Sequence, residues 1–86
     1  MIYSADLLRA AHKHTTDHRR DLERSDICGC FYCLQTFQAT EIEIWLEEGS
    51  GTALCPRCGI DSVLGVASGY PAGELAFLNA MHGLWF

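Results

Sequence analysis

The 86-residue sequence lacks any apolar run of about 18 residues or more, the length that a membrane-spanning helix needs. Its first residues, Met-Ile-Tyr-Ser-Ala-Asp, also lack the basic segment and apolar stretch of a secretory signal peptide. We therefore expect no membrane association and no export, and we expect the chain to act in the cytoplasm. Hydrophobic residues make up 49% of the sequence, too many for a disordered chain, so a folded domain is predicted.

Basic residues are nearly absent from the second part of the chain. Residues 27–86 contain only Arg57 against six acidic residues, whereas the other five basic residues lie within the first 24 positions. Because nucleic-acid binding depends mainly on Lys and Arg contacts to phosphates, this distribution argues against DNA or RNA as a partner. Nucleic-acid binding through a basic N-terminal helix stays the weakest alternative.

Four of the five cysteines form two pairs with Cys-x-x-Cys spacing, and Gly59 follows the second pair. The pairs are Cys30-Phe-Tyr-Cys33 and Cys55-Pro-Arg-Cys58. A pair on a tight turn directs two thiolates at one ion, and two pairs complete the tetrahedral shell that zinc prefers. An odd number of cysteines without an export signal favours reduced thiols on a metal over disulfides. We therefore predict a structural zinc site formed by Cys30, Cys33, Cys55 and Cys58.

The fifth cysteine, Cys28, lies two residues before the first pair. It could replace Cys30 as a ligand, but the longer spacing to Cys33 makes a poorer zinc-binding turn. We expect Cys28 to be a small buried apolar residue. A spare thiol that senses oxidants beside the metal is the alternative.

The hydrophobic pattern predicts an α+β fold in which a zinc ribbon lies between two helices. The first helix is expected over residues 5–24, with Ser4 as its N-cap. The zinc ribbon is expected over 27–65, with a strand, the second cysteine pair and another strand forming its main hairpin. One stripe of the first helix should face the core. The residues of that stripe are Leu7, Ala11, His14, Thr15, His18 and Leu22.

Two shorter helices complete the predicted domain. One is expected over residues 41–48, between the two cysteine pairs, because Thr40 and Glu43 fit a capping box and Gly49 can end a helix. The other is expected over residues 72–83. With only 86 residues the chain is near the lower size limit for a fold supported by its core alone, and a metal is a common remedy. A single zinc-binding domain is therefore predicted over residues 1–86.

Short strings along the chain, the cysteine pairs among them, form a specific pattern. They are Ala11-His-Lys-His14, His18-Arg19, Cys28-Gly-Cys-Phe-Tyr-Cys33, Thr52-Ala-Leu-Cys-Pro-Arg-Cys-Gly-Ile-Asp-Ser-Val63, Ser68-Gly-Tyr-Pro71 and Trp85-Phe86. With these strings the chain resembles, over nearly its whole length, a family of small bacterial proteins called cytoplasmic proteins, of unknown function. The resemblance implies a zinc-ribbon-like metal site and a cytoplasmic setting, and it implies no activity.

His14 and His18 lie four residues apart in the predicted first helix, so they could bind a second metal from one face. A metal-dependent hydrolase or nuclease is therefore one alternative. The hydrolytic H-E-x-x-H helix, however, needs a glutamate directly after its first histidine, where this chain has Thr15. A nuclease built on a zinc finger also needs His and Asn near the finger, and Asn79 is the only asparagine. We expect both histidines to be hydrogen-bonded residues at the edge of the core.

These observations favour a metal-stabilised module that binds another protein. Four thiolates fill every position of the predicted zinc shell, so no position stays open for water or substrate. The acidic second half and the C-terminal Trp85 and Phe86 could supply the contact surface. We expect these two aromatic residues to dock on the domain, and exposure to a partner is the alternative. No catalytic residue is predicted.

Overall fold

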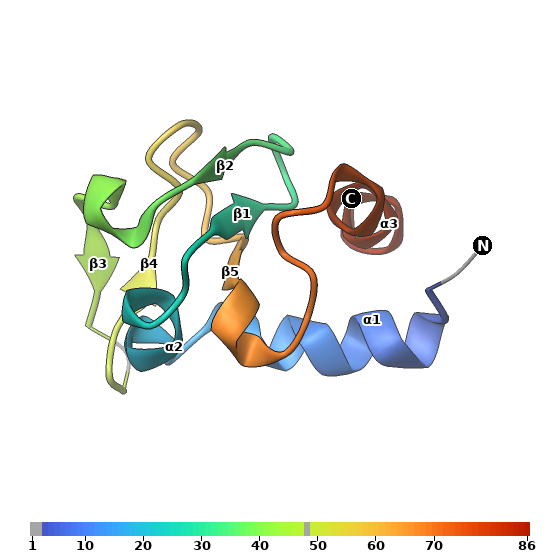
Figure 1. The fold of residues 1–86 in the computed structure, drawn as a ribbon, viewed down its shortest axis with the longest axis horizontal. Helices are drawn as coiled ribbons and strands as arrows, with labels where there is room; N and C mark the ends of the chain where they lie inside the picture. Colours follow the sequence, from blue (N-terminus) through green and yellow to red (C-terminus); the bar gives the residue numbers. More distant parts are fainter. Residues whose placement is uncertain (1–2, 48) are drawn as a thin grey trace.

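The computed structural model describes residues 3–47 and 49–86 and has short helices around two small antiparallel sheets (Figure 1). This arrangement confirms the predicted α+β class. The first sheet has the order β2-β1-β5 and the second pairs β3 with β4. The strands are β1 (Cys28–Cys30), β2 (Thr36–Phe37), β3 (Trp45–Leu46), β4 (Thr52–Ala53) and β5 (Val63–Gly65).

The central strand β1 is buried along its whole length. Cys28 pairs with Phe37 of β2 on one side and with Gly65 of β5 on the other. Gly29 is required in this strand because a Cβ atom there would overlap the carbonyl oxygen of Ala72 and press on Leu78. The absent side chain therefore lets the segment that leads into the C-terminal helix cross directly over β1.

The predicted hairpin between the strands that flank the second cysteine pair is absent from the described residues. β4 pairs with β3, through Trp45 opposite Ala53, whereas β5 pairs with β1, through Cys30 opposite Val63. The two strands thus diverge into different sheets once they leave the cysteine turn. A zinc-ribbon hairpin was the wrong expectation, because local spacing does not specify which distant strand a segment pairs with.

The predicted helix over residues 5–24 is interrupted. It is replaced by α1 (Ala5–His12), a short 3-10 helix η1 (Lys13–Thr15) and α2 (Arg19–Glu23). At the break, Asp17 adopts a left-handed conformation with φ of 49°. The N–H groups of Asp17 and His18 leave the helix and donate to Thr52 Oγ1 and to the Gly51 carbonyl, each at 3.0 Å. Contacts to β4 therefore outweigh the helical hydrogen bonds at this point.

The buried stripe of these helices differs from the predicted stripe at one end. Ala11, Thr15, His18 and Leu22 are buried as predicted. Leu7 is 37% exposed and Leu8, at 3%, takes its place in the core. The shift by one residue turns α1 toward the C-terminal helix α3 (Leu75–Trp85). His14, which the stripe also included, is only half-buried.

The prediction of a helix over residues 41–48 is also wrong for residues 41–47, the part of this range that the structure describes. The structure has a 3-10 helix η2 (Ala39–Glu41) followed by extended chain and β3. The capping box uses Gln38 and Glu41 rather than Thr40 and Glu43. Ile42, Ile44 and Trp45 are β-branched or aromatic, so this segment favours an extended conformation once β4 is available as a partner.

The C-terminal helix α3 begins three residues later than predicted and continues to Trp85. A turn precedes it, in which the Glu74 N–H donates to the Pro71 carbonyl at 3.0 Å. Gly83 does not end the helix, and Phe77, Leu78 and Met81 form its buried side. Across the described residues, no helix is both long enough and apolar enough to cross a bilayer.

The buried side chains form two clusters. One fills the space between α1, α3 and the sheet, and the other surrounds the cysteine pairs. The first contains Leu8, Ala11, Phe31, Leu64, Ala72, Phe77, Leu78 and Met81. The second contains Leu22, Cys28, Cys30, Phe37, Ile42, Ala53, Cys55 and Val63. The cysteine site is thus part of the second core cluster.

Candidate metal centre

The four paired cysteines converge at one point. Their sulfur atoms all lie within 4.8 Å of one another. Cys30 Sγ lies 3.7 Å from Cys58 Sγ, and Cys33 Sγ lies 3.7 Å from Cys55 Sγ. These distances exclude disulfides, whose sulfur atoms are about 2 Å apart. Four sulfurs bound tetrahedrally at about 2.3 Å from zinc would lie about 3.8 Å from one another. The four residues are therefore placed to hold a metal ion, and their spacing is compatible with zinc.

The two cysteine turns have the same backbone hydrogen bonds. In the first, the Leu34 N–H donates to the Cys30 carbonyl at 2.9 Å, and the Cys30 N–H donates to the Gln35 carbonyl at 3.0 Å. In the second, the Gly59 N–H donates to the Cys55 carbonyl at 2.9 Å, and the Cys55 N–H donates to the Ile60 carbonyl at 2.9 Å. Two unrelated sequences thus adopt one conformation, the tight turn that directs both thiolates of a pair to one side.

Backbone N–H groups also point at the sulfur atoms in both turns. The Tyr32 N–H lies 3.4 Å from Cys30 Sγ, and the Arg57 N–H lies 3.3 Å from Cys55 Sγ. Such N–H groups stabilise negative charge on a thiolate. They therefore offset part of the negative charge that four thiolates bring around one cation.

The residue after each turn has a left-handed backbone. Gly59 has φ of 80° and Leu34, at the equivalent position, has φ of 64°. Glycine adopts this conformation freely, whereas leucine does so at a cost of about 1–2 kcal/mol. The sequence indicates this backbone conformation at Gly59 but not at Leu34, because a leucine gives no signal for it. Leu34 packs against the first core cluster, and this contact holds it there.

The protonation of the thiols depends on burial and on the N–H groups. Burial raises the pKa of Cys30, so that thiol ionises only when a cation balances its charge. Burial also acts against ionisation of Cys55, but hydrogen bonds from the N–H groups of Arg57 and Cys58 and from the thiols of Cys33 and Cys58 together lower the pKa of Cys55. Because metal binding requires all four thiolates, a divalent cation is the expected compensating charge.

Cys28 does not belong to this set. It is fully buried in β1, and its thiol faces the Leu22 carbonyl at 3.9 Å. Burial raises the pKa of Cys28 to about 11, so the thiol is neutral near pH 7. Its environment is that of a small apolar core residue rather than of a reactive thiol.

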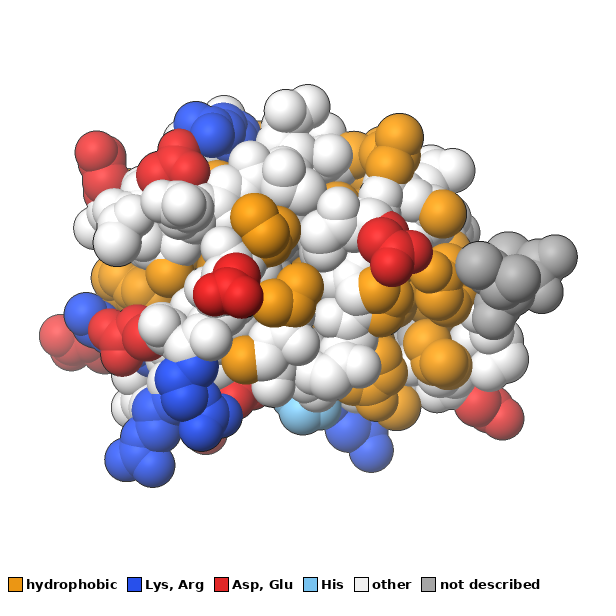
Figure 2. Space-filling view, viewed as in Figure 1, with side chains coloured by type: hydrophobic (Ala, Val, Ile, Leu, Met, Phe, Trp, Pro, Cys, Tyr) orange, Lys and Arg blue, Asp and Glu red, His pale blue; other side chains and the backbone are white. Residues whose placement is uncertain are grey.

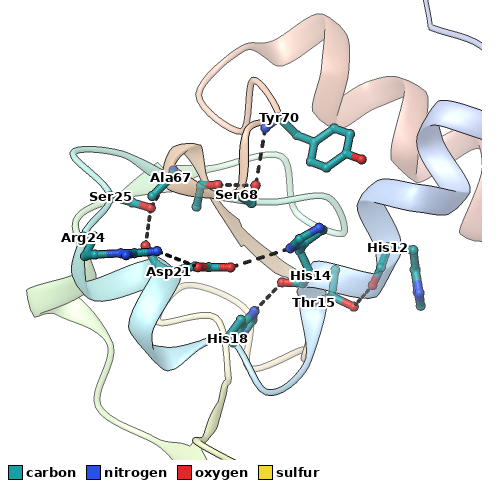
Figure 3. Close-up of polar contacts among 11 residues, drawn as sticks. His12, His14, Thr15, His18, Asp21, Arg24, Ser25, Ala67, Ser68 and Tyr70 are labelled. Carbon is teal, nitrogen blue, oxygen red and sulfur yellow. Dashed lines mark hydrogen bonds and ion pairs between the residues drawn. The ribbon is translucent and has the colours of Figure 1, made fainter.

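His18 has both ring nitrogens engaged within the protein. Its Nδ1 lies 2.7 Å from the His14 carbonyl oxygen, to which it donates (Figure 3). Its Nε2 accepts from the Ala53 N–H at 3.0 Å. The neutral imidazole satisfies both bonds, and burial lowers the pKa of His18. The side chain therefore connects the break between η1 and α2 to β4, and neither nitrogen is free to bind a metal.

His14 lies at the edge of a small polar network (Figure 3). Its Nδ1 is 3.6 Å from Asp21 Oδ2, and Arg24 pairs with the other oxygen of that carboxylate at 3.2 Å. The His14 ring also faces Tyr70, with 5.5 Å between ring centroids. The two histidines therefore point to different partners and do not form a common metal site. In the described chain, the four cysteines are the only group of three or more ligands placed to share a metal ion.

The C-terminal aromatic residues lie against the rest of the protein but stay partly exposed. The Trp85 ring lies 4.0 Å from the His12 ring, centroid to centroid, and the Phe86 ring contacts Tyr32 edge-on at 4.9 Å. Trp85 is 39% exposed and Phe86 57% exposed. Figure 2 shows hydrophobic side chains gathered on the right, over α1 and α3. Trp85, Phe86 and Tyr32 therefore form an aromatic surface next to the first cysteine turn.

The comparisons with known proteins give no relative for this chain: no family model, no curated protein and no solved structure matches it.

Proposed function

We propose that this chain is a zinc-stabilised protein-interaction module of the bacterial cytoplasm and a member of the family of small cytoplasmic proteins that its motifs resemble. The observation that carries the proposal is the set of four sulfurs at tetrahedral spacing. Cys30, Cys33, Cys55 and Cys58 would hold the zinc, which would link the two turns and the sheets that they connect. A catalytic zinc keeps one position open for water or substrate, and four thiolates leave none.

The geometry gives little support to the alternative of a hydrolase or nuclease. Metal-dependent hydrolysis would need His14 and His18 on one metal ion, yet His18 uses both ring nitrogens for backbone hydrogen bonds. Nucleic-acid binding through the first helix is equally weakly supported. Arg9, Arg19 and Arg24 each pair with a nearby carboxylate, so part of the basic charge of α1 and α2 is neutralised.

The aromatic surface of Trp85, Phe86 and Tyr32 is the first candidate contact for a partner protein. Aromatic side chains often carry much of the binding energy at protein interfaces, and these three are each at least 39% exposed. Zinc would keep the first cysteine turn, and with it Phe31 and Tyr32, in place beneath Phe86.

The test begins with the immobilised, zinc-loaded protein and a cytoplasmic extract. A captured protein is then purified, and its affinity is measured for the wild type, for Trp85→Ala and for a control, Leu75→Ala. Leu75 is 64% exposed on the same helix. We expect Trp85→Ala to weaken binding about tenfold and Leu75→Ala to change it little. Metal-dependent hydrolysis of an ester or nucleic acid by the purified protein, abolished by His14→Ala, would overturn the proposal.

A further inference from the structure

The strand β3 lies at one end of the molecule, on the left in Figure 1, and within the described residues only β4 pairs with it. The Ile44 carbonyl, just before β3, accepts from the N–H of Leu54, just after β4, at 3.0 Å. Because hydrogen-bonding directions alternate along an antiparallel strand, the N–H and C=O of the next residue, Trp45, point away from β4. An extended peptide could therefore add to this edge as a further strand.

Side chains on the two faces of β3 line separate hollows. Trp45 contributes to one of about 280 Å³, together with Arg19, Glu23 and Thr40. Ile44 contributes to another of about 210 Å³, together with Leu54, Pro56 and Arg57. Neighbouring residues of an added strand also point to opposite faces, so its side chains could reach both hollows. This combination of a free edge and side-chain hollows is typical of sites that bind extended peptides.

Two exposed acidic residues flank an apolar stretch along this edge. Ile44 is 59% exposed and Leu46 36% exposed, and the exposed Glu43 and Glu47 flank them. Within residues 3–47 and 49–86 neither glutamate forms an ion pair. Figure 2 shows acidic and hydrophobic side chains together at this end of the molecule, with a few basic ones.

The basic side chains that line the two hollows already have acidic partners. Arg57 pairs with Glu41 at 2.8 Å, and Arg19 pairs with Glu23 at 3.1 Å. The Arg19 guanidinium also lies 4.5 Å above the Trp45 ring. The charge that this edge offers to a partner is therefore that of Glu43 and Glu47, which is negative.

We propose that the outer edge of β3 binds an extended protein segment in which basic and apolar residues alternate. This inference rests on the proposed function and names the kind of segment that the partner supplies. A second copy of the chain fits poorly at the same edge. Antiparallel pairing of two β3 strands around Trp45 would place Glu43 of one copy opposite Glu47 of the other, and like charges in that position are destabilising.

The probe is a fluorescently labelled, end-capped peptide of alternating arginine and valine, titrated into the zinc-loaded protein and followed by anisotropy. We expect saturable binding that Glu43→Lys combined with Glu47→Lys weakens about tenfold or more. Asp26→Lys combined with Asp61→Lys is the matched control, because it changes net charge equally at exposed acidic positions outside β3. The control should retain affinity within about twofold.

Two further peptides test strand addition itself, one N-methylated at every valine and the other at every arginine. Only one set of N–H groups faces the edge of β3, so one peptide should lose binding and the other should keep it. Absence of saturable binding, equal weakening by both protein variants, or equal behaviour of the two methylated peptides would overturn the inference.

The outcomes for this edge and for the proposed function are distinguishable. If the arginine–valine peptide fails to bind while capture through Trp85 persists, the β3 edge is not the binding site, but the proposed function as an interaction module still holds. Hydrolysis that depends on His14 would remove the proposed function whatever the peptide does.

Discussion

Gly59 and Gly83 allow the same change, glycine to alanine, to be made in two backbone settings with equal free space. A Cβ atom at either position would have no heavy atom within 4 Å, so neither substitution introduces a clash. Gly59 has φ of 80°, in the left-handed region, whereas Gly83 lies within α3. The backbone conformation alone should therefore decide the sign of each effect.

For Gly59→Ala, the left-handed backbone should lower the free energy of unfolding by about 1 kcal/mol. For Gly83→Ala, the better helix propensity of alanine should raise it by about 0.5 kcal/mol. Because the second cysteine turn must form to bind metal, the cost at Gly59 should also weaken zinc binding, by about fivefold for about 1 kcal/mol.

The assay is urea unfolding of the zinc-loaded proteins, with zinc affinity measured by competition against a chromophoric chelator. Gly83→Ala serves as the control in both measurements and should leave zinc affinity unchanged. If Gly59→Ala is as stable as the wild type and binds zinc equally well, the backbone of this turn does not hold the metal site in the way described.

Two further predictions concern the cysteines and His18. Cys55→Ser should abolish zinc binding and cooperative unfolding. Cys28→Ser should retain zinc and lose about 1–3 kcal/mol of stability, because it places a polar group in the core. Zinc analysis and thermal unfolding check both variants, and full zinc in Cys55→Ser would contradict the ligand set. Because burial lowers the pKa of His18, the folded protein binds fewer protons there than the unfolded chain. The contribution of His18 to stability is therefore complete above about pH 6.5 and is lost as the pH falls below that value, through the lowered pKa of the folded state. His18→Gln should flatten this pH dependence in urea unfolding of zinc-loaded protein at a series of pH values, and an unchanged slope would contradict the buried neutral imidazole.

The cysteine site was the most predictable part of the molecule because its information is local. A Cys-x-x-Cys turn needs only four residues, and two such turns imply one shared ion. The assignment of Cys28 to the core could likewise be predicted from its position outside the pairs. By contrast, the equivalence of Leu34 and Gly59 could not be predicted, since tertiary packing holds the leucine in its left-handed conformation.

The helices and strands were less predictable because distant contacts decide them. The break at Asp17 depends on Thr52 and Gly51, which accept hydrogen bonds that a continuous helix would have kept. A signal for this break existed in the sequence, where two β-branched threonines precede an aspartate, all poor residues for a helix interior. The short strand β3 replaced a predicted helix because β4 pairs with it, and no local pattern identifies that partner.

The closed zinc site of four thiolates can be measured by X-ray absorption at the zinc edge, combined with a metal count on the same protein. We expect one zinc ion per chain with four sulfur neighbours at about 2.3 Å and no nitrogen or oxygen ligand. A second zinc ion, or a shell of fewer than four sulfurs completed by nitrogen or oxygen, would contradict it.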